Sequence, residues 1–137
     1  MCAVNVKVRN VRGVEVDWND PRNIYAGRGE KDLYKLGLGN PYPMKNGEDT
    51  RVWRERVCNL VKMDVTDALR IRKGDMWKKL CALSIAYTQQ GELTLWCWCA
   101  PLRCHAEEYV RGIQVLEDEL DAWCHKSLEM GATGQEA

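Results

Sequence analysis

Hydrophobic and polar positions alternate in several short stretches of the chain, and this alternation predicts strands. The valines of residues 4–9 alternate with polar residues, so we expect a strand there with its valines facing inward. Residues 23–26 predict a second core strand, whereas the shorter alternation over 14–18 fits a strand or an extended segment. Residues 93–99, Leu-Thr-Leu-Trp-Cys-Trp-Cys, are β-prone and apolar on both faces, which is typical of a buried central strand.

Three later stretches carry apolar residues at helical spacing. The first helix is expected to open with Glu48 and Asp49, whose charge suits the helix dipole, and a separate helical turn is expected over residues 68–72. Asp75 is expected to cap a second helix, which ends at Gly91. The last helix is predicted over residues 105–128, and the apolar stripe that should pack it against the core consists of Tyr109, Ile113, Leu116, Leu120 and Trp123.

Strands interleaved with helices indicate an α/β fold, a small single-domain layered structure with a partly parallel sheet flanked by helices. A chain of 137 residues fits one domain, which we expect over residues 1–130, followed by a flexible C-terminal tail over 131–137. No stretch approaches the roughly 18 consecutive apolar residues of a membrane helix, and the N-terminus lacks the pattern of a signal peptide. We therefore expect a cytoplasmic protein without a membrane partner.

Charge is balanced over the whole chain but unevenly distributed along it. The formal net charge is zero and the isoelectric point is about 6.7. Among the charged residues, however, Lys and Arg predominate over residues 51–79, and Asp and Glu predominate over residues 105–137. A basic segment can contact phosphates, but it can equally lie beside the acidic last helix, and a solvated helix face is the simpler interpretation. The overall balance does not support nucleic-acid binding as the main function.

The sharpest chemical signal is the segment Cys97-Trp-Cys99-Ala-Pro-Leu-Arg-Cys104-His105. The seven cysteines of the chain are an odd number in a domain that needs no disulfide framework, so we expect reduced thiols. Cys104 and His105 fall where the last helix begins, and a helix N-terminus stabilises a thiolate. We therefore predict Cys104 as an activated thiol and His105 as a base or anion contact, and these two residues are the catalytic candidates.

Three interpretations of this segment remain open. In the first, an activated-thiol or ligand-gripping loop, Cys97 and Cys99 project to one face of the strand and contact a ligand. In the second, Cys97, Cys99, Cys104 and His105 bind a structural zinc ion, although their spacing differs from that of familiar zinc sites. In the third, the segment only packs and caps. We expect no cofactor, with zinc as the alternative.

A glycine-rich segment follows the second predicted strand. Gly27, Arg28 and Gly29 offer backbone N–H groups and a guanidinium to an anion, although their spacing matches neither the dinucleotide fingerprint nor the P-loop. Because ligands gather beyond the carboxyl ends of strands in such sheets, we expect Arg28 to face the start of the last helix across a shared pocket. The candidate ligand-binding residues are Tyr25, Gly27, Arg28, Gly29, Gly39, Asn40, Cys97 and Cys99.

Three motifs of the chain together resemble a known family. They are Tyr25-x-Gly-Arg-Gly, Leu38-Gly-Asn-Pro-Tyr and Cys97-x-Cys-x-Pro-x-x-Cys-His, and their order is similar to that in the family named domain of unknown function 4326, found in phages and bacteria. The resemblance spans roughly residues 4–125. It implies a phage or bacterial origin and a common site built from the three motifs, but no activity. Ala106, where members often carry glycine, and the longer segment Glu30–Leu36 depart from the family pattern.

Our first functional hypothesis is a domain that binds a phosphorylated or nucleotide-like small molecule, with processing of that ligand as a further option. Arg28 and the glycines would bind the anion, Asn40 would fix the loop, and Cys104 with His105 would carry any covalent or proton chemistry. The alternatives are a non-catalytic phage protein that binds a host factor, and a structural zinc-binding module. The sequence leaves open whether the protein is an enzyme and which oligomeric state it has.

Overall fold

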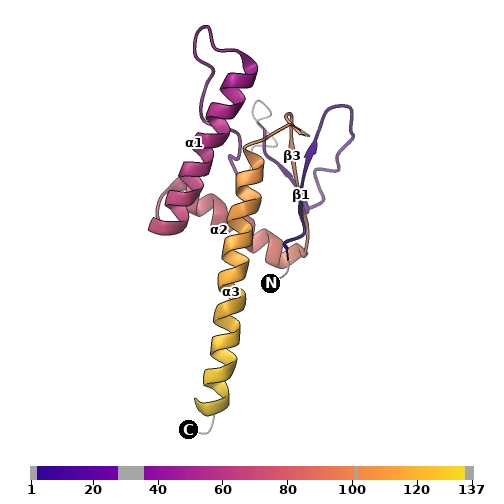
Figure 1. The fold of residues 1–137 in the computed structure, drawn as a ribbon. Helices are drawn as coiled ribbons and strands as arrows, with labels where there is room; N and C mark the ends of the chain where they lie inside the picture. Colours follow the sequence, from indigo (N-terminus) through magenta and orange to yellow (C-terminus); the bar gives the residue numbers. More distant parts are fainter. Residues whose placement is uncertain (1–2, 28–35, 101, 135–137) are drawn as a thin grey trace.

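A computed structural model describes residues 3–27, 36–100 and 102–134 of the chain (Figure 1). Two short strands come first, and three helices and the third strand follow. In chain order the elements are β1 (Val6–Asn10), β2 (Asn23–Tyr25), α1 (Thr50–Ile71), α2 (Asp75–Gln90), β3 (Leu93–Cys97) and α3 (Ala106–Gly134). The expected α/β class is confirmed, whereas residues 14–18 take no part in a strand.

β3 occupies the centre of a three-stranded sheet with the order β1-β3-β2, and it pairs in parallel with both neighbours. Asn10 pairs with Cys97, and Tyr25 pairs with Trp96, so all three strands end at the same edge. The central position predicted for the apolar segment 93–99 is therefore confirmed. Since parallel strands end together, the residues that follow β1, β2 and β3 are brought together at this edge.

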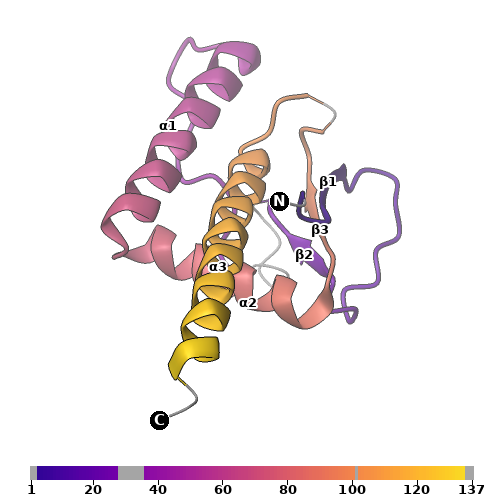
Figure 2. The same cartoon turned by 60° about the horizontal axis from the view of Figure 1, so that its bottom comes forward.

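The helices lie on one side of the sheet, with α3 between α1 and the strands (Figure 2). α1 is one continuous helix through Ile71, because Val65 and Ala68 extend its buried stripe, so the separate turn expected over 68–72 is wrong. Asp49 caps α1 through its side chain, which accepts a hydrogen bond from the backbone N–H of Val52. The N-cap of α2 is Gly74, and Asp75 is the first helical residue instead of the predicted cap.

Only the first half of α3 belongs to the core. Tyr109 and Ile113 are fully buried and Leu116 packs against the core, but Leu120 is 44% exposed and Trp123 is 64% exposed. The predicted burial of the last two residues is therefore wrong. The physical reason is visible in Figure 1, where the second half of α3 extends past the rest of the domain. Residues 131–134, expected in the tail, still belong to this helix.

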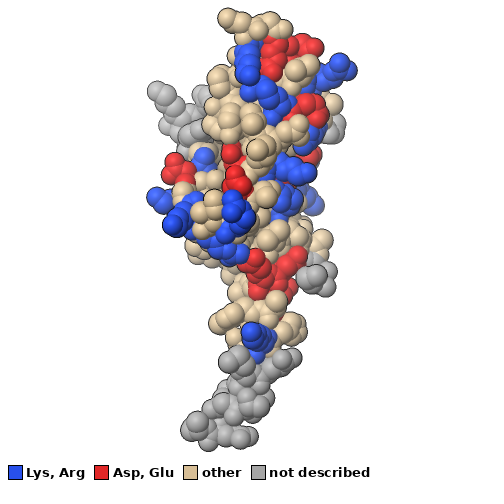
Figure 3. All heavy atoms as spheres, turned by 60° about the vertical axis from the view of Figure 1, so that its left-hand side comes forward, with Lys and Arg blue, Asp and Glu red and all other residues tan. Residues whose placement is uncertain are grey.

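The basic middle of the chain lies beside acidic side chains. Arg72 at the end of α1 bonds Glu119 of α3 at 2.6 Å, and Arg103 bonds Glu55 of α1 at 2.7 Å. Figure 3 shows Lys and Arg side chains interspersed with Asp and Glu on the face that α1 presents. In the described part of the chain, no helix has both the length and the apolar character needed to cross a membrane.

The two halves of α3 should respond differently to the loss of an apolar side chain. We expect Ile113→Ala to lower the free energy of unfolding by about 2–5 kcal/mol, because it leaves a cavity in the core. Leu120→Ala should cost less than about 1 kcal/mol, because this side chain is already half exposed. Urea denaturation measures both values. Equal losses in the two variants would show that the end of α3 is buried in solution.

Candidate functional site

The carboxyl edge of the sheet positions the candidate site. The backbone N–H of Val11 donates to the carbonyl of Cys97 at 2.8 Å, and the N–H of Ala26 donates to the carbonyl of Trp96 at 2.8 Å. These bonds continue the ladder just beyond both outer strands. The segments that leave β1 and β2 therefore start on either side of the segment that leaves β3, as the sheet topology predicts.

Tyr25 and Gly27 contact the cysteine segment through Trp98. The indole Nε1–H of Trp98 donates to the hydroxyl oxygen of Tyr25 at 2.9 Å. The Tyr25 ring lies over Gly27, where an added Cβ would come within 2.5 Å of the Tyr25 hydroxyl oxygen. Gly27 is therefore required by the position of this ring. Arg28 and Gly29 lie outside the described residues, so the shared pocket of Arg28 and Cys104 stays a prediction.

The carbonyl oxygen of Leu38 ties the second motif to the start of α3. His105 Nε2 lies 2.8 Å from this oxygen, and the Tyr109 hydroxyl donates to it at 3.0 Å. Gly39 and Asn40 are buried beside it, and the Asn40 side chain accepts the backbone N–H of Tyr42 at 2.7 Å, which forms a tight turn. Two of the predicted site residues thus shape a buried loop that α3 holds in place.

The contact with Leu38 fixes the tautomer of His105. A carbonyl oxygen only accepts hydrogen bonds, so the neutral imidazole carries its proton on Nε2, which leaves Nδ1 as an acceptor. His105 Nδ1 lies 3.8 Å from Cys104 Sγ. This assignment makes His105 an acceptor for the Cys104 thiol proton.

Three cysteines of the segment form a cluster at the end of β3, and we name Cys97, Cys99 and Cys104 the thiol cluster. Cys97 and Cys104 are each 1% exposed, whereas Cys99 is partly exposed. The backbone N–H of Ala100 donates to Cys97 Sγ at 3.4 Å, and the N–H of Ala106 donates to Cys104 Sγ at 3.5 Å. Both contacts come from the loop and helix start that enclose the sulfur atoms.

Charge within the thiol cluster favours Cys97 and Cys99 over Cys104. A hydrogen bond from the Cys104 thiol lowers the pKa of Cys97 to about 6 and that of Cys99 to about 7, against opposing effects of burial. The pKa of Cys104 itself is raised, first by its hydrogen bonds to Cys97 and Cys99 and then by burial. Our expectation that the helix N-terminus lowers the pKa of Cys104 is therefore wrong, because the interactions with Cys97 and Cys99 and the burial of the side chain favour the protonated thiol more strongly.

A cavity of about 370 Å³ lies beside β2, where no site residue except Tyr25 was predicted. The rings of Trp18 and Tyr25 meet edge to face with their centroids 5.8 Å apart. Asn19, Asp20 and Asn23 provide polar groups around these rings, and the full lining is Trp18, Asn19, Asp20, Pro21, Asn23, Ile24, Tyr25 and Leu36. The cavity therefore combines aromatic walls with amide and carboxylate groups.

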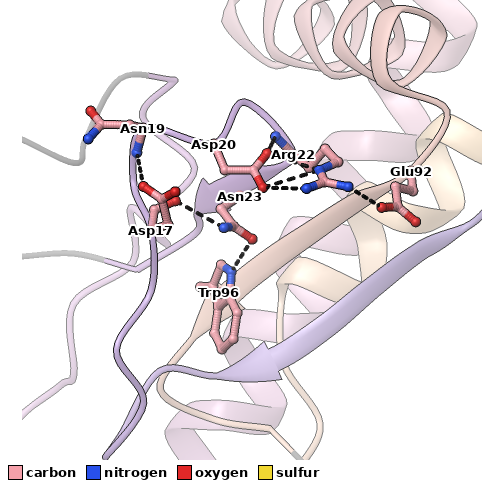
Figure 4. Close-up of polar contacts among 7 residues, drawn as sticks. All are labelled: Asp17, Asn19, Asp20, Arg22, Asn23, Glu92 and Trp96. Atoms are coloured by element: carbon pink, nitrogen blue, oxygen red, sulfur yellow. Dashed lines mark hydrogen bonds and ion pairs between the residues drawn. The ribbon is translucent and has the colours of Figure 1, made fainter.

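A hydrogen-bond network fixes the polar side of this cavity (Figure 4). The Asn23 amide donates to the backbone carbonyl of Asp17 at 3.0 Å and accepts the Trp96 indole N–H at 3.0 Å. Arg22 bonds Asp20 at 2.7 Å and Glu92 at 2.9 Å. The hydrogen bonds from Arg22 lower the pKa of Asp20 to about 2, so this carboxylate stays ionised at neutral pH.

Residues 8–114 match the family described as Domain of unknown function (DUF4326). The chain belongs to this family. The match covers all three motifs described above. No curated protein and no solved structure matches the chain.

The zinc alternative for this DUF4326 domain rests on four side chains around the end of β3 and the start of α3. His105 directs Nε2 to the carbonyl of Leu38, whereas its Nδ1 lies 3.8 Å from Cys104 Sγ. Across residues 3–27, 36–100 and 102–134, no group of three or more His, Cys, Asp or Glu side chains is placed to hold a metal ion. Zinc binding by Cys97, Cys99, Cys104 and His105 therefore stays an alternative prediction.

Two residues of α1 extend the site beyond the predicted set. Arg54 contributes to lowering the pKa of Cys99, and the charge of Cys99 in turn contributes to raising the pKa of buried Cys58. Burial is the main cause that raises the pKa of Cys58, to about 11. Arg54 and Cys58 are four residues apart and therefore lie on the same face of the helix. This spacing is the sequence signal that could have linked the two residues.

The lowered pKa of Cys97 predicts a stability that increases with pH. Between about pH 7 and pH 8.5 the folded state holds the thiolate while the unfolded chain still binds the proton, so the free energy of unfolding rises by up to about 1.4 kcal/mol per pH unit. This contribution is lost as the pH falls through the folded value of about 6. Cys104 stays protonated in this window in both states.

Urea denaturation in the presence of a phosphine reductant measures the slope. We expect Cys97→Ser to reduce it, and Cys124→Ser, which changes an exposed cysteine on α3, to leave it unchanged. A slope that is the same in the Cys97→Ser variant and the unmodified chain would contradict a thiolate at Cys97.

Proposed function

We propose that this DUF4326 domain binds a nucleotide-like small molecule, with the base in the cavity beside β2 and the phosphate directed towards the carboxyl edge of the sheet. The observation that carries the proposal is the cavity itself, in which Trp18 and Tyr25 provide aromatic walls next to Asn19 and Asp20. Binding is the core of this proposal. Processing of the ligand by Cys104 and His105 stays a prediction, as do the phage or bacterial origin and the cytoplasmic location.

The dimensions and chemistry of the cavity support a nucleoside. A volume of about 370 Å³ lies within the range of small-molecule sites, which is roughly 300–1,000 Å³. Base stacking on an aromatic side chain contributes about 1–3 kcal/mol and suits any nucleobase. The ionised carboxylate of Asp20 is an acceptor for sugar hydroxyl groups, which are donors.

The position of Tyr25 supports a link between the cavity and the motifs of the family. Its ring lines the cavity, and its hydroxyl accepts the indole N–H of Trp98, which lies between Cys97 and Cys99. Gly27, two residues after the end of β2 at Tyr25, leads into the segment that contains Arg28. The predicted anion-binding glycines, Gly27 and Gly29, thus follow within four residues of Tyr25 in the sequence, which is consistent with a ligand that binds beside Tyr25 and extends its phosphate towards them.

A panel of nucleosides and nucleoside mono- and diphosphates, screened by thermal shift and followed by calorimetry, tests the proposal. A ligand at 100 times its Kd adds about 2.7 kcal/mol to the free energy of unfolding, which is a clear shift in melting temperature. We expect Trp18→Ala to weaken binding at least about tenfold, because stacking is lost. Trp123→Ala is the matched control, since this tryptophan is exposed on α3 away from the cavity.

Two outcomes would remove the proposal. One is the absence of stabilisation by every member of the panel at millimolar concentration. The other is unchanged affinity in the Trp18→Ala variant, which would place any bound nucleotide outside this cavity.

A non-catalytic interaction protein is the second candidate. It is supported by the exposed apolar residues at the end of α3 and by a groove of about 530 Å³ between α2 and α3. This groove is lined in part by Trp77, Cys81, Ile85, Leu116 and Leu120. Larger exposed apolar surfaces mark interaction sites. Sedimentation of the full chain and of an Ile85→Glu variant separates the candidates, because self-association that is lost in the variant supports this second one alone.

A further inference from the structure

In the described part of the chain, one face of the sheet carries no helix. The helices lie on the other side (Figure 2), where Leu95 belongs to the core and Val8 packs against it. Because side chains alternate along a strand, Lys7 and Arg9 of β1 and Thr94 of β3 point to the face without helices. Lys7 pairs with Thr94 in the register of the two strands, so their side chains lie next to each other on this face.

A cavity of about 240 Å³ lies on this face of the sheet. Thr94 contributes to its lining together with three cationic side chains and two carboxylates, which are those of Lys7, Arg9, Arg22, Asp20 and Glu92. Arg22 binds both carboxylates, Asp20 at 2.7 Å and Glu92 at 2.9 Å (Figure 4). The two acids are thus already paired with one cation, and the other two positive charges of the lining favour an anion.

Lys7 and Arg9 are available to such an anion. Neither side chain forms an ion pair within residues 3–27, 36–100 and 102–134. The guanidinium of Arg9 lies over the Trp96 ring, with its Cζ atom 5.3 Å from the ring centroid. This cation–π contact restricts the Arg9 side chain before any ligand binds, which lowers the entropy that binding would cost.

We propose that Lys7, Arg9 and Thr94 bind a phosphate group in this cavity. The ammonium of Lys7 supplies a point charge, the guanidinium of Arg9 supplies paired N–H donors that match phosphate oxygens, and the Thr94 hydroxyl supplies a further donor. The cavity volume of about 240 Å³ is below the roughly 300–1,000 Å³ of typical small-molecule sites, so it suits a compact group. The site is additional to the phosphate contact proposed at the carboxyl edge of the sheet, and it does not depend on nucleotide binding.

The phosphate group has two sources of the same chemistry, inorganic phosphate and a second phosphate of a nucleotide. Asp20 and Asn23 line both this cavity and the cavity beside β2, so the two cavities are neighbours. A nucleoside in the cavity beside β2 can therefore direct a phosphate past Asp20 and Asn23 towards Lys7. Because the proposed function directs another phosphate to the carboxyl edge, this ligand would be a nucleoside 3′,5′-bisphosphate.

The first test is a titration of the full, reduced chain with inorganic phosphate at constant ionic strength, followed by ¹H–¹⁵N nuclear magnetic resonance. We expect saturable shifts at the backbone N–H groups of Lys7, Arg9 and Thr94, and at the indole N–H of Trp96, whose ring contacts Arg9. The absence of saturable shifts at millimolar phosphate would overturn the proposal. Saturable shifts confined to residues outside the cavity would also overturn it.

Variants separate a built site from a general effect of charge. Lys7→Gln and Arg9→Gln should each raise the Kd for phosphate at least about tenfold, because a hydrogen bond between charged groups is lost, whereas Lys7→Arg should retain binding. Arg51→Gln is the matched control, since it removes the same charge from an exposed position on α1 outside the cavity. Equal weakening by Arg51→Gln, or an unchanged Kd in Lys7→Gln, would contradict the site. If Arg9→Gln fails to fold, Lys7→Gln decides, because it changes an exposed side chain.

Calorimetry with nucleotides distinguishes the two sources of the phosphate group. If a nucleotide supplies it, a nucleoside 3′,5′-bisphosphate should bind more tightly than the 5′-monophosphate, and Lys7→Gln should remove this advantage without changing the affinity for the monophosphate. If inorganic phosphate is the ligand, the two nucleotides should bind equally and Lys7→Gln should weaken phosphate alone. An advantage of the bisphosphate that persists in Lys7→Gln would overturn the nucleotide source. Inorganic phosphate tests this site even where no nucleotide binds, so a failure of the site and a failure of the proposed function are told apart.

Discussion

The parallel pairing of β3 with both of its neighbours is the constraint on which the rest of this structure depends. Because β1 and β2 run in the same direction as β3, the three segments that follow the strands start at one edge of the sheet. An antiparallel partner would have placed its following segment at the opposite edge. The contact between Trp98 and Tyr25 results from this arrangement.

The carbonyl of Leu38 is the second organising contact. It accepts hydrogen bonds from Tyr109 and, in the tautomer we assign, from His105, so one backbone oxygen attaches the loop of the second motif to the first turn of α3. This gives His105 a structural role that also has a chemical consequence. A ring held by Nε2 presents Nδ1 to its own neighbour, Cys104, and a base is thereby created inside a buried site.

The thiol cluster shows how neighbours outweigh a helix terminus. The N–H of Ala106 favours a thiolate at Cys104, but two sulfur acceptors and deep burial act against it more strongly. The pKa is therefore raised at Cys104 and lowered at Cys97 and Cys99. Arg54, one turn before Cys58 on α1, adds to this preference at Cys99.

The sequence by itself determined the elements with strong local signals and the identity of the chemical motifs. The central strand, the approximate start of α1 and the family match follow from periodicity, the acidic residues at 48–49 and motif spacing, which are properties of neighbouring residues. The tertiary structure decided what depends on surroundings. It left Leu120 and Trp123 exposed because the end of α3 extends past the rest of the described domain, and it placed Trp18 and Tyr25 around a cavity. The sequence predicted a lowered pKa at Cys104, whereas in the structure the pKa is lowered at Cys97 and Cys99. The reason is that the pKa of a buried thiol depends on the groups that packing places around it.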